Sequence, residues 1–415
     1  MSRSPTGGPT LSQRRLHPML DLKLDLLQTL SLAAVLHYGG LALRTRIGTL
    51  NRLNIPAAVV GGLGFALLVL IGRDRFLTVQ VDTSAQPVLF VAFFTTIGMG
   101  ASLAVLRSGG RQVAWFLLLA TIFCLVQNVI GVGIAAGFGH NPLLGVVAGS
   151  VTLVGGPGTG LAFAPLFEQA GLVGAGTLAL TAATFGIVSG GLAGAPVSTR
   201  LIQSHRLTSP GGPSGDTAEA ATLVVETERE DTTLIRNAVV LAGAMGVGSI
   251  VSRLIQSAGI TLPPYIGAML VASVLRHLDD TRGWFRLDQR AMDFIGGLAL
   301  NIFLVVALMD LKLWQLAGQA LVLVVILAAQ VVTVAAVALT LLHRSMGRDY
   351  EAAVMAGGFI GFALGTTANA VANMRAVTAR FGPAPRAFLV VPLVGAFFVD
   401  FANALIITGF VNWLR

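Results

Sequence analysis

Charged side chains are scarce in this chain. Asp, Glu, Lys and Arg make up 11% of its 415 residues, whereas a soluble domain carries about 25%. Hydrophobic residues make up 54%, and the mean hydropathy is +0.80. The apolar runs are about twenty residues long, as membrane helices require, while the strands of a membrane β-barrel would be short and alternating. The sequence therefore predicts an all-α polytopic membrane protein in the lipid bilayer.

Cysteine is almost absent, and so are the signatures of enzymatic chemistry. Cys124 is the single cysteine, which excludes an intrachain disulfide and a thiolate metal cluster. The sequence contains no Walker A lysine, no HExxH motif and no visible nucleophile–base arrangement. We therefore expect no ATP site, no enzyme and no organic cofactor. The first twenty residues lack the apolar core of a secretory signal peptide.

Apolar spans and two interrupted segments account for most of the chain. The two segments, 143–168 and 351–375, are broken by glycine and small polar residues, and we predict that they form re-entrant helical hairpins. The predicted organisation is a disordered tail 1–25, an N-terminal repeat 26–198, a linker 199–233 and a C-terminal repeat 234–415. The spans are expected at about 26–43, 56–72, 87–106, 113–138, 174–197, 235–256, 264–278, 290–310, 315–342 and 385–412.

The two halves repeat at a shift of about 208 residues, which places Gly145–Ser150 on Ala353–Gly358 and Thr159 on Thr367. Each half thus has five spans and one hairpin in the same order. Because five is odd, the halves must lie in the membrane with opposite orientations. Such inverted-topology repeats are typical of secondary transporters.

The placement of Lys and Arg supports this topology. With the linker in the cytoplasm, eighteen of the 27 basic residues fall in cytoplasmic connections, and five fall outside: Arg73, Arg75, Arg253, Lys312 and Arg415. This is the positive-inside pattern. The N-terminal tail is the exception, because its basic residues would lie outside. Basic residues in short connections also argue against a nucleic-acid partner, despite the net charge of +8.

The two interrupted segments carry the predicted site. Four glycines and Pro157 crowd into residues 155–160, which is too dense for an intact helix. Free N–H groups at the resulting half-helix ends attract carboxylates, and free carbonyls attract cations. The alternative is that these glycines only allow close helix packing. We expect the two tips to meet and to bind substrate through Gly156, Gly158, Thr159, Gly160, Thr366, Thr367, Asn369 and Asn373.

Asp400 lies in the middle of the last span, where a carboxylate costs at least ~2.5–3.5 kcal/mol and therefore indicates function. It is expected to bind sodium, the ammonium group of a substrate, or both; a structural hydrogen bond and a proton-carrier role are the alternatives. The predicted sodium ligands are Ser150, Thr152, Asp400 and Asn403, because hard cations prefer oxygen. Gln127, Asn128 and Gln330 are expected to make interhelical hydrogen bonds.

At these residues the chain resembles the bacterial sodium/glutamate symporters, the ESS family. The resemblance covers about residues 27–410 and implies co-transport of L-glutamate with sodium ions across the bacterial inner membrane. It also implies a homodimer and an elevator-type cycle, in which each hairpin and its flanking spans slide past a scaffold of the first spans. The matching stretches are Phe93–Gly98, Gln127–Gly131, Ala148–Gly160, Ala183–Gly186, Ala307–Trp314, Ala372–Met374, Arg380–Pro383 and Phe388–Ala404.

Two other functions stay open from the residues alone. One is a sodium- or proton-coupled carrier for another organic anion, such as a di- or tricarboxylate. The other is a channel-like membrane protein that binds without pumping. Paired hairpins in opposite orientations favour a carrier over a channel.

Overall fold

The computed structural model describes residues 20–52, 55–72, 77–100, 102, 110–209, 230–257, 264–313 and 318–414. Among these residues, six helices are long and apolar enough to cross a membrane. This confirms the prediction of an all-α polytopic membrane protein. Helices dominate because apolar backbone in lipid must pair its own N–H and C=O groups.

The N-terminal half consists of helices with one interrupted segment before the last of them. This segment comprises the short helix α7, the π-helical stretch η1 and helix α8. It covers residues 143–169, the stretch for which the sequence predicts a re-entrant hairpin at 143–168. The helices of this half are α1 (Leu26–Arg46), α2 (Gly48–Arg52), α3 (Ala57–Gly72), α4 (Gln86–Gly100), α6 (Gly110–Gly137), α7 (Leu143–Val146), η1 (Val147–Val151), α8 (Gly156–Gln169) and α9 (Ala175–Ser204).

The C-terminal half also consists of helices, with an interruption between α15 and α16. These two helices pack against each other as a hairpin, which extends six residues beyond the predicted end at 375. The helices of this half are α10 (Glu230–Ser257), α11 (Pro264–Arg282), α12 (Gln289–Met309), α13 (Ala320–Val337), η3 (Ala338–Leu342), α14 (His343–Ser345), α15 (Tyr350–Leu364), α16 (Thr367–Phe381), α17 (Pro385–Leu393), η4 (Val394–Phe398) and α18 (Val399–Leu414).

A small parallel ribbon precedes the first helix. It pairs strand β1 (Leu20–Lys23) with strand β2 (Leu77–Gln80). Most of the predicted disordered tail 1–25 lies outside the described residues, but its last part forms β1. The centre of the predicted linker, 210–229, also lies outside them.

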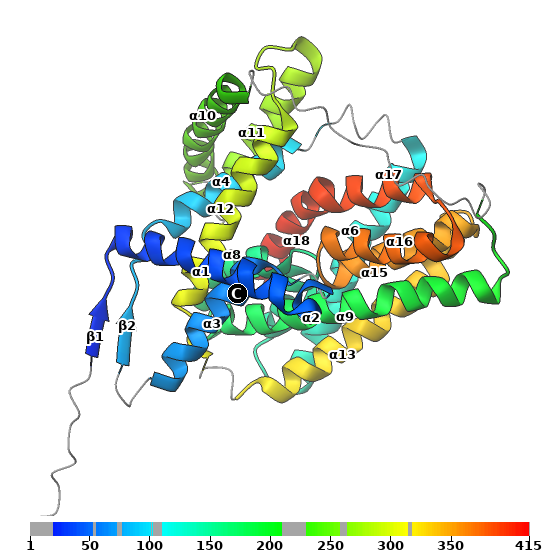
Figure 1. The fold of residues 1–415 in the computed structure, drawn as a ribbon, viewed down its shortest axis with the longest axis horizontal. Helices are drawn as coiled ribbons and strands as arrows, with labels where there is room; N and C mark the ends of the chain where they lie inside the picture. The colour runs from blue at the N-terminus through cyan, green and yellow to red at the C-terminus, as the bar shows by residue number, and fades with distance from the viewer. Residues whose placement is uncertain are drawn as a thin grey trace, which may run out of the picture.

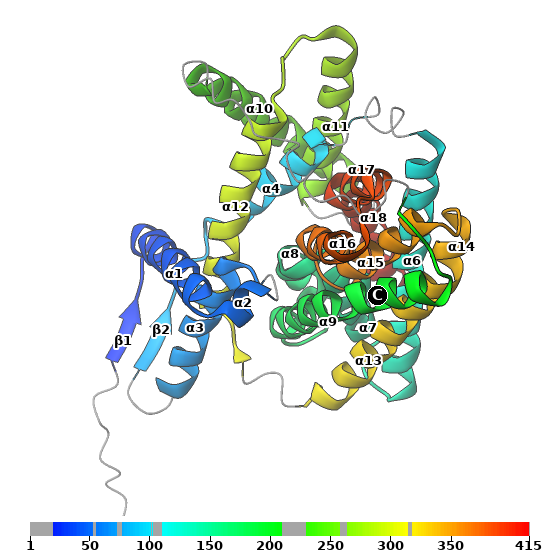
Figure 2. The ribbon, with the colours of Figure 1, turned by 45° about the vertical axis from the view of Figure 1, so that its right-hand side comes forward.

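The helices gather into two groups, which Figures 1 and 2 show from two directions. The first group contains α1, α3 and α4 together with α10, α11 and α12; the second contains α6 to α9 together with α13 to α18. Each group therefore combines helices of both halves. Helix α8 of the second group also packs against α12 of the first, so it lies at the boundary between the groups.

Candidate substrate and ion site

The first helix break lies between Gly149 and Gly156. Gly149 has non-helical torsion angles (φ −101°, ψ −132°) within η1. Gly156 has φ +69°, a left-handed conformation that glycine adopts without steric cost. Pro157 follows in the first turn of α8, where its missing N–H needs no partner. The glycines and the proline thus end one helix and begin the next inside the protein.

Two asparagines on other helices hold the backbone of Ser150 at this break. The N–H of Ser150 donates to Oδ1 of Asn128 on α6 at 2.9 Å. The carbonyl of Ser150 accepts from Nδ2 of Asn403 on α18 at 2.8 Å. All three residues are almost completely buried. Asn128 thus gives the buried N–H of Ser150 a partner, as buried backbone requires. The Asn403 bond adds to those that the carbonyl of Ser150 accepts from the N–H groups of Val154 and Gly155 at 3.3 and 3.1 Å.

The second break is at Gly365 and Thr366. Gly365 ends α15 with φ −151° and ψ −95°. The Thr366 hydroxyl accepts from the N–H of Asn369 at 3.3 Å and caps α16. The Thr367 hydroxyl donates to the carbonyl of Gly395 in η4 at 2.7 Å. This tip therefore lies against a π-helical stretch that ends two residues before Asp400.

The two breaks are in contact. A Cβ atom added to Gly156 would lie 3.6 Å from the carbonyl oxygen of Gly365 and 3.8 Å from Cγ2 of Thr366. Helices α8 and α16 both begin at this contact. Their first N–H groups and the positive ends of two helix dipoles therefore converge on one place.

The remaining hairpin residues divide into two sets. Gly158, Thr159 and Gly160 form the first turn of α8 and are buried. Asn369 and Asn373, in contrast, turn their amides toward α9: Asn369 donates to the carbonyl of Ile187 at 2.7 Å, and Asn373 donates to that of Gly190 at 2.9 Å. The structure thus places Asn373 between α9 and α15, where it also bonds to Gly357.

Two of the four predicted sodium ligands are in direct contact, and a third lies on the same helix as one of them. Ser150 and Asn403 are hydrogen-bonded, and Asp400 lies one turn before Asn403 on α18. Ser150 Oγ and Asn403 Oδ1 are buried atoms without a hydrogen-bond partner. The hydroxyl of the fourth residue, Thr152, is occupied by a 2.7 Å bond to the carbonyl of Val147.

Asp400 has no ion-pair or hydrogen-bond partner within the described part of the chain. It lies within electrostatic range of Cys124 on α6. A structural hydrogen bond, the alternative for this carboxylate, therefore finds no support among the described residues. A carboxylate with unused oxygen atoms beside Asn403 suits a cation.

Gln127 and Gln330 were expected to bond between helices, and they do. Gln330 Nε2 donates to the carbonyl of Gln127 at 2.7 Å, and Gln127 Nε2 donates to that of Ala363 at 2.9 Å. The Oε1 atoms of both glutamines are buried and unpartnered, so each offers a further oxygen beside the hairpins. The sequence signal for both is a polar residue within an otherwise apolar span.

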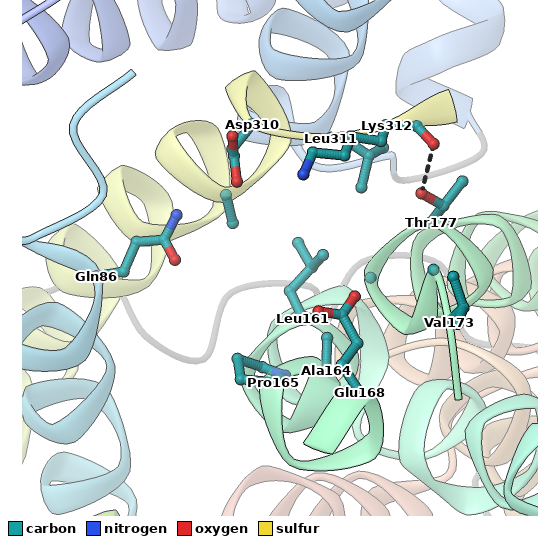
Figure 3. A pocket seen from close by; sticks show the side chains of 13 residues that line it. Gln86, Leu161, Ala164, Pro165, Glu168, Val173, Thr177, Asp310, Leu311 and Lys312 are labelled. Carbon is teal, nitrogen blue, oxygen red and sulfur yellow. Dashed lines mark hydrogen bonds between the residues drawn. The ribbon is translucent and has the colours of Figure 1, made fainter. Parts of the chain in front are cut away.

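A cavity of about 320 Å³ lies at the far end of α8 (Figure 3). One face of α8 lines it through Leu161, Ala164 and Glu168, while Asp310 and Lys312 line the opposite side. It separates the two helix groups, and the hydroxyl of Thr177 on α9 reaches across to the carbonyl of Lys312 at 3.1 Å. None of the predicted site residues lines this cavity.

Between the cavity and the helix breaks the two groups pack tightly. A Cβ atom on Gly158 would lie 2.7 Å from Cδ1 of Leu300. Phe163 of α8 packs edge-on against Tyr265 of α11, with ring centroids 5.5 Å apart. The described side chains thus separate the cavity from the tips in this conformation.

The chain is similar to known symporters. The family profile of the sodium/glutamate symporters matches residues 22–383. The sodium/glutamate symporter of Escherichia coli (strain K12) is 41% identical over 388 residues, which cover 92% of this chain and 96% of that protein. Its counterpart in Haemophilus influenzae is 38% identical, covering 92% and 95%. The chain therefore belongs to the sodium/glutamate symporter family and is a membrane transporter rather than an enzyme.

Proposed function

We propose that this protein is a secondary active transporter that couples the uptake of L-glutamate to sodium ions across the bacterial inner membrane. The main observation in support of this proposal is the contact between the two helix breaks, where Gly156 lies beside Gly365 and Thr366. The names of the related proteins, which are sodium/glutamate symporters, support the same substrates.

The start of α8 and the start of α16 suit the carboxylates of glutamate. Each offers N–H groups without helical partners, and each carries the positive end of a dipole. We place the substrate at Gly156, Gly158, Thr159 and Gly160 on one side and at Thr366, Thr367 and Asn369 on the other. Asn373 has a supporting role, because its amide holds α16 to α9.

Sodium binds next to the substrate in this proposal. Asp400, Asn403 and Ser150 supply oxygen atoms, and the unpartnered Oε1 atoms of Gln127 and Gln330 supply two more. Burying glutamate, with its net negative charge, is costly without a cation nearby. Sodium therefore tightens substrate binding, and by linkage the substrate tightens sodium binding by the same factor. Symport follows if a carrier that holds only sodium or only glutamate seldom changes between its outward-facing and inward-facing states.

We further propose that the two halves are inverted repeats and that transport uses an elevator motion. The second helix group would carry the hairpins past the first group, which would form the scaffold and the interface of a homodimer. The packing of each group from helices of both halves supports this division. The cavity beside Glu168 and Lys312 would then be the outer mouth of the route along α8.

Uptake of labelled glutamate into proteoliposomes tests the function. We expect accumulation under an inward sodium gradient and none when potassium replaces sodium. The absence of accumulation under the sodium gradient would refute the proposal. Competition by aspartate, glutamine and citrate separates glutamate transport from transport of another organic anion, since only the true substrate class competes at low concentration.

Asp400→Asn tests the proposed sodium ligand. We expect sodium-driven uptake to fall by about tenfold or more, which corresponds to ~1.4 kcal/mol of lost binding. The matched control is Asp293→Asn, because Asp293 is an exposed carboxylate on α12 that only accepts from Gln289. Normal uptake by Asp400→Asn would remove this residue from the site.

A further inference from the structure

A second cavity, of about 750 Å³, opens at the beginning of α6. Arg111, Gln112, Trp115 and Leu118 line it from α6, and the turn Met346–Gly347 lines it from the end of α14. It shares no residue with the candidate substrate and ion site. It lies at the same end of the helices as the basic residues assigned to the cytoplasmic side.

Arg111 makes this cavity positive. Its side chain is exposed and has no ion-pair or hydrogen-bond partner in the described parts of the chain. It lies in the first turn of the 28-residue helix α6, whose first N–H groups lack helical partners and whose dipole is positive at this end. An uncompensated guanidinium beside a helix N-terminus favours a phosphate group.

An apolar stripe runs from this cavity along α6. The exposed side chains are Trp115, Leu118, Ile122, Leu125 and Val129, which are 42–60% exposed. Their spacing of three and four residues puts them on one face of the helix. From Trp115 to Val129 this face extends roughly 21 Å at 1.5 Å per residue, about half the thickness of a bilayer including its headgroups.

We propose that the cavity and the stripe together bind one anionic phospholipid. Its phosphate lies at Arg111 and the start of α6, Trp115 lies at the level of the headgroup, and an acyl chain follows the stripe. Free phosphate has no acyl chain to pack on the apolar stripe. The headgroup of a zwitterionic lipid carries a positive charge, which Arg111 repels. Basic pockets between helices on the cytoplasmic side suit anionic headgroups. The inference does not depend on which solute is transported.

The site has a consequence for the moving helices. The opposite face of α6 buries Phe123, Cys124, Gln127 and Asn128, and the last two contact the hairpins. A lipid bound to α6 is therefore attached to the helix group that carries the proposed ion site. We expect its occupancy to stabilise this group against thermal unfolding.

Native mass spectrometry of the full-length protein in detergent tests the proposal. Phosphatidylglycerol and phosphatidylcholine with identical acyl chains are added separately. We expect the wild type to retain phosphatidylglycerol, and Arg111→Gln to retain it about fivefold more weakly, since one basic residue near a membrane surface contributes about 1 kcal/mol. Arg200→Gln is the matched control, because Arg200 is an exposed basic residue at the cytoplasmic end of α9.

Quenching of tryptophan fluorescence by lipids with brominated acyl chains gives a second measurement, which does not require the Arg111→Gln substitution. In a variant whose other three tryptophans are replaced by phenylalanine, brominated phosphatidylglycerol should quench Trp115 at lower lipid fractions than brominated phosphatidylcholine. Equal retention of both lipids by the wild type, equal retention by Arg111→Gln, or equal quenching by the two lipids would each overturn the proposal.

Discussion

Single residues decide the local geometry of the two helix breaks. Gly156 has φ +69°, and its α-carbon faces the carbonyl of Gly365 and the methyl group of Thr366. A side chain here strains the backbone, because φ is positive, whereas its Cβ would make only ordinary van der Waals contact with the second tip. The left-handed backbone at position 156 thus favours glycine whether or not a ligand binds there.

Gly156→Ala should therefore reduce both stability and transport. A left-handed conformation costs an L-residue roughly 1–2 kcal/mol, so we expect a lower thermal unfolding temperature in detergent and reduced uptake. Gly133→Ala on α6 is the control, because a Cβ there meets no atom within 4 Å. Unchanged unfolding of Gly156→Ala would mean that the break adopts another conformation.

Asn403 is the residue whose loss should affect the first break most directly. Asn403→Ala removes the 2.8 Å bond from Asn403 Nδ2 to the buried carbonyl of Ser150. Because this carbonyl keeps its bonds from the N–H groups of Val154 and Gly155, we expect a cost of about 0.5–1.5 kcal/mol, that of one hydrogen bond. We expect a lower unfolding temperature and a higher sodium concentration for half-maximal uptake. Asn301→Ala is the comparison, since the Asn301 amide bonds only to a carbonyl of its own helix. Equal effects of the two variants would argue against a special role for Asn403.

At the scale of elements, ionic contacts hold the base of the second hairpin. Arg386, at the start of α17, donates to both carboxylate oxygens of Asp349 at 2.6 and 2.7 Å. Asp349 caps α15 by accepting from the N–H of Ala352. Glu351 lies 3.6 Å from Arg386 Nε. One arginine thus joins α17 to the base of the second hairpin.

Arg386→Ala should loosen the second hairpin. The change leaves the largely buried Glu351 without a cation, and we expect it to cost about 1–3 kcal/mol, seen as earlier thermal unfolding and faster hydrogen exchange in α15. Arg386→Lys should recover part of the loss, because it keeps the charge but lacks the planar guanidinium that reaches Asp349 through Nη2 and Glu351 through Nε. Arg282→Ala, at an exposed position on α11, should change neither measurement.

At the scale of the whole molecule, the boundary between the helix groups matters most. Few contacts cross it, and α8 makes several of them. A sliding motion of one group past the other would break these contacts, including the bond from Thr177 to the carbonyl of Lys312. Contacts inside a group would persist through the same motion.

Cross-linking distinguishes these two kinds of contact. With Cys124→Ala as background, cysteines at Thr177 and Lys312 joined by a short bismaleimide should stop uptake, while each single cysteine should not. A pair within one group, at Ser198 and Ala353, where the hydroxyl of Ser198 lies 2.7 Å from the carbonyl of Ala353, should leave uptake intact when joined. Full uptake by the first cross-linked pair would exclude the elevator motion.

The sequence alone determined the class of the molecule and the places where its helices end. Long apolar runs specify membrane helices, and the crowding of Gly155–Gly160 with Pro157 specifies a break, because both depend on local chemistry. Only the tertiary structure decided which side chains stabilise those breaks. Asn128, Asn403 and Gln127 act on backbone far away in the chain, and Asn373 turns toward α9, since such contacts depend on how whole helices pack and leave no pattern in the neighbouring residues.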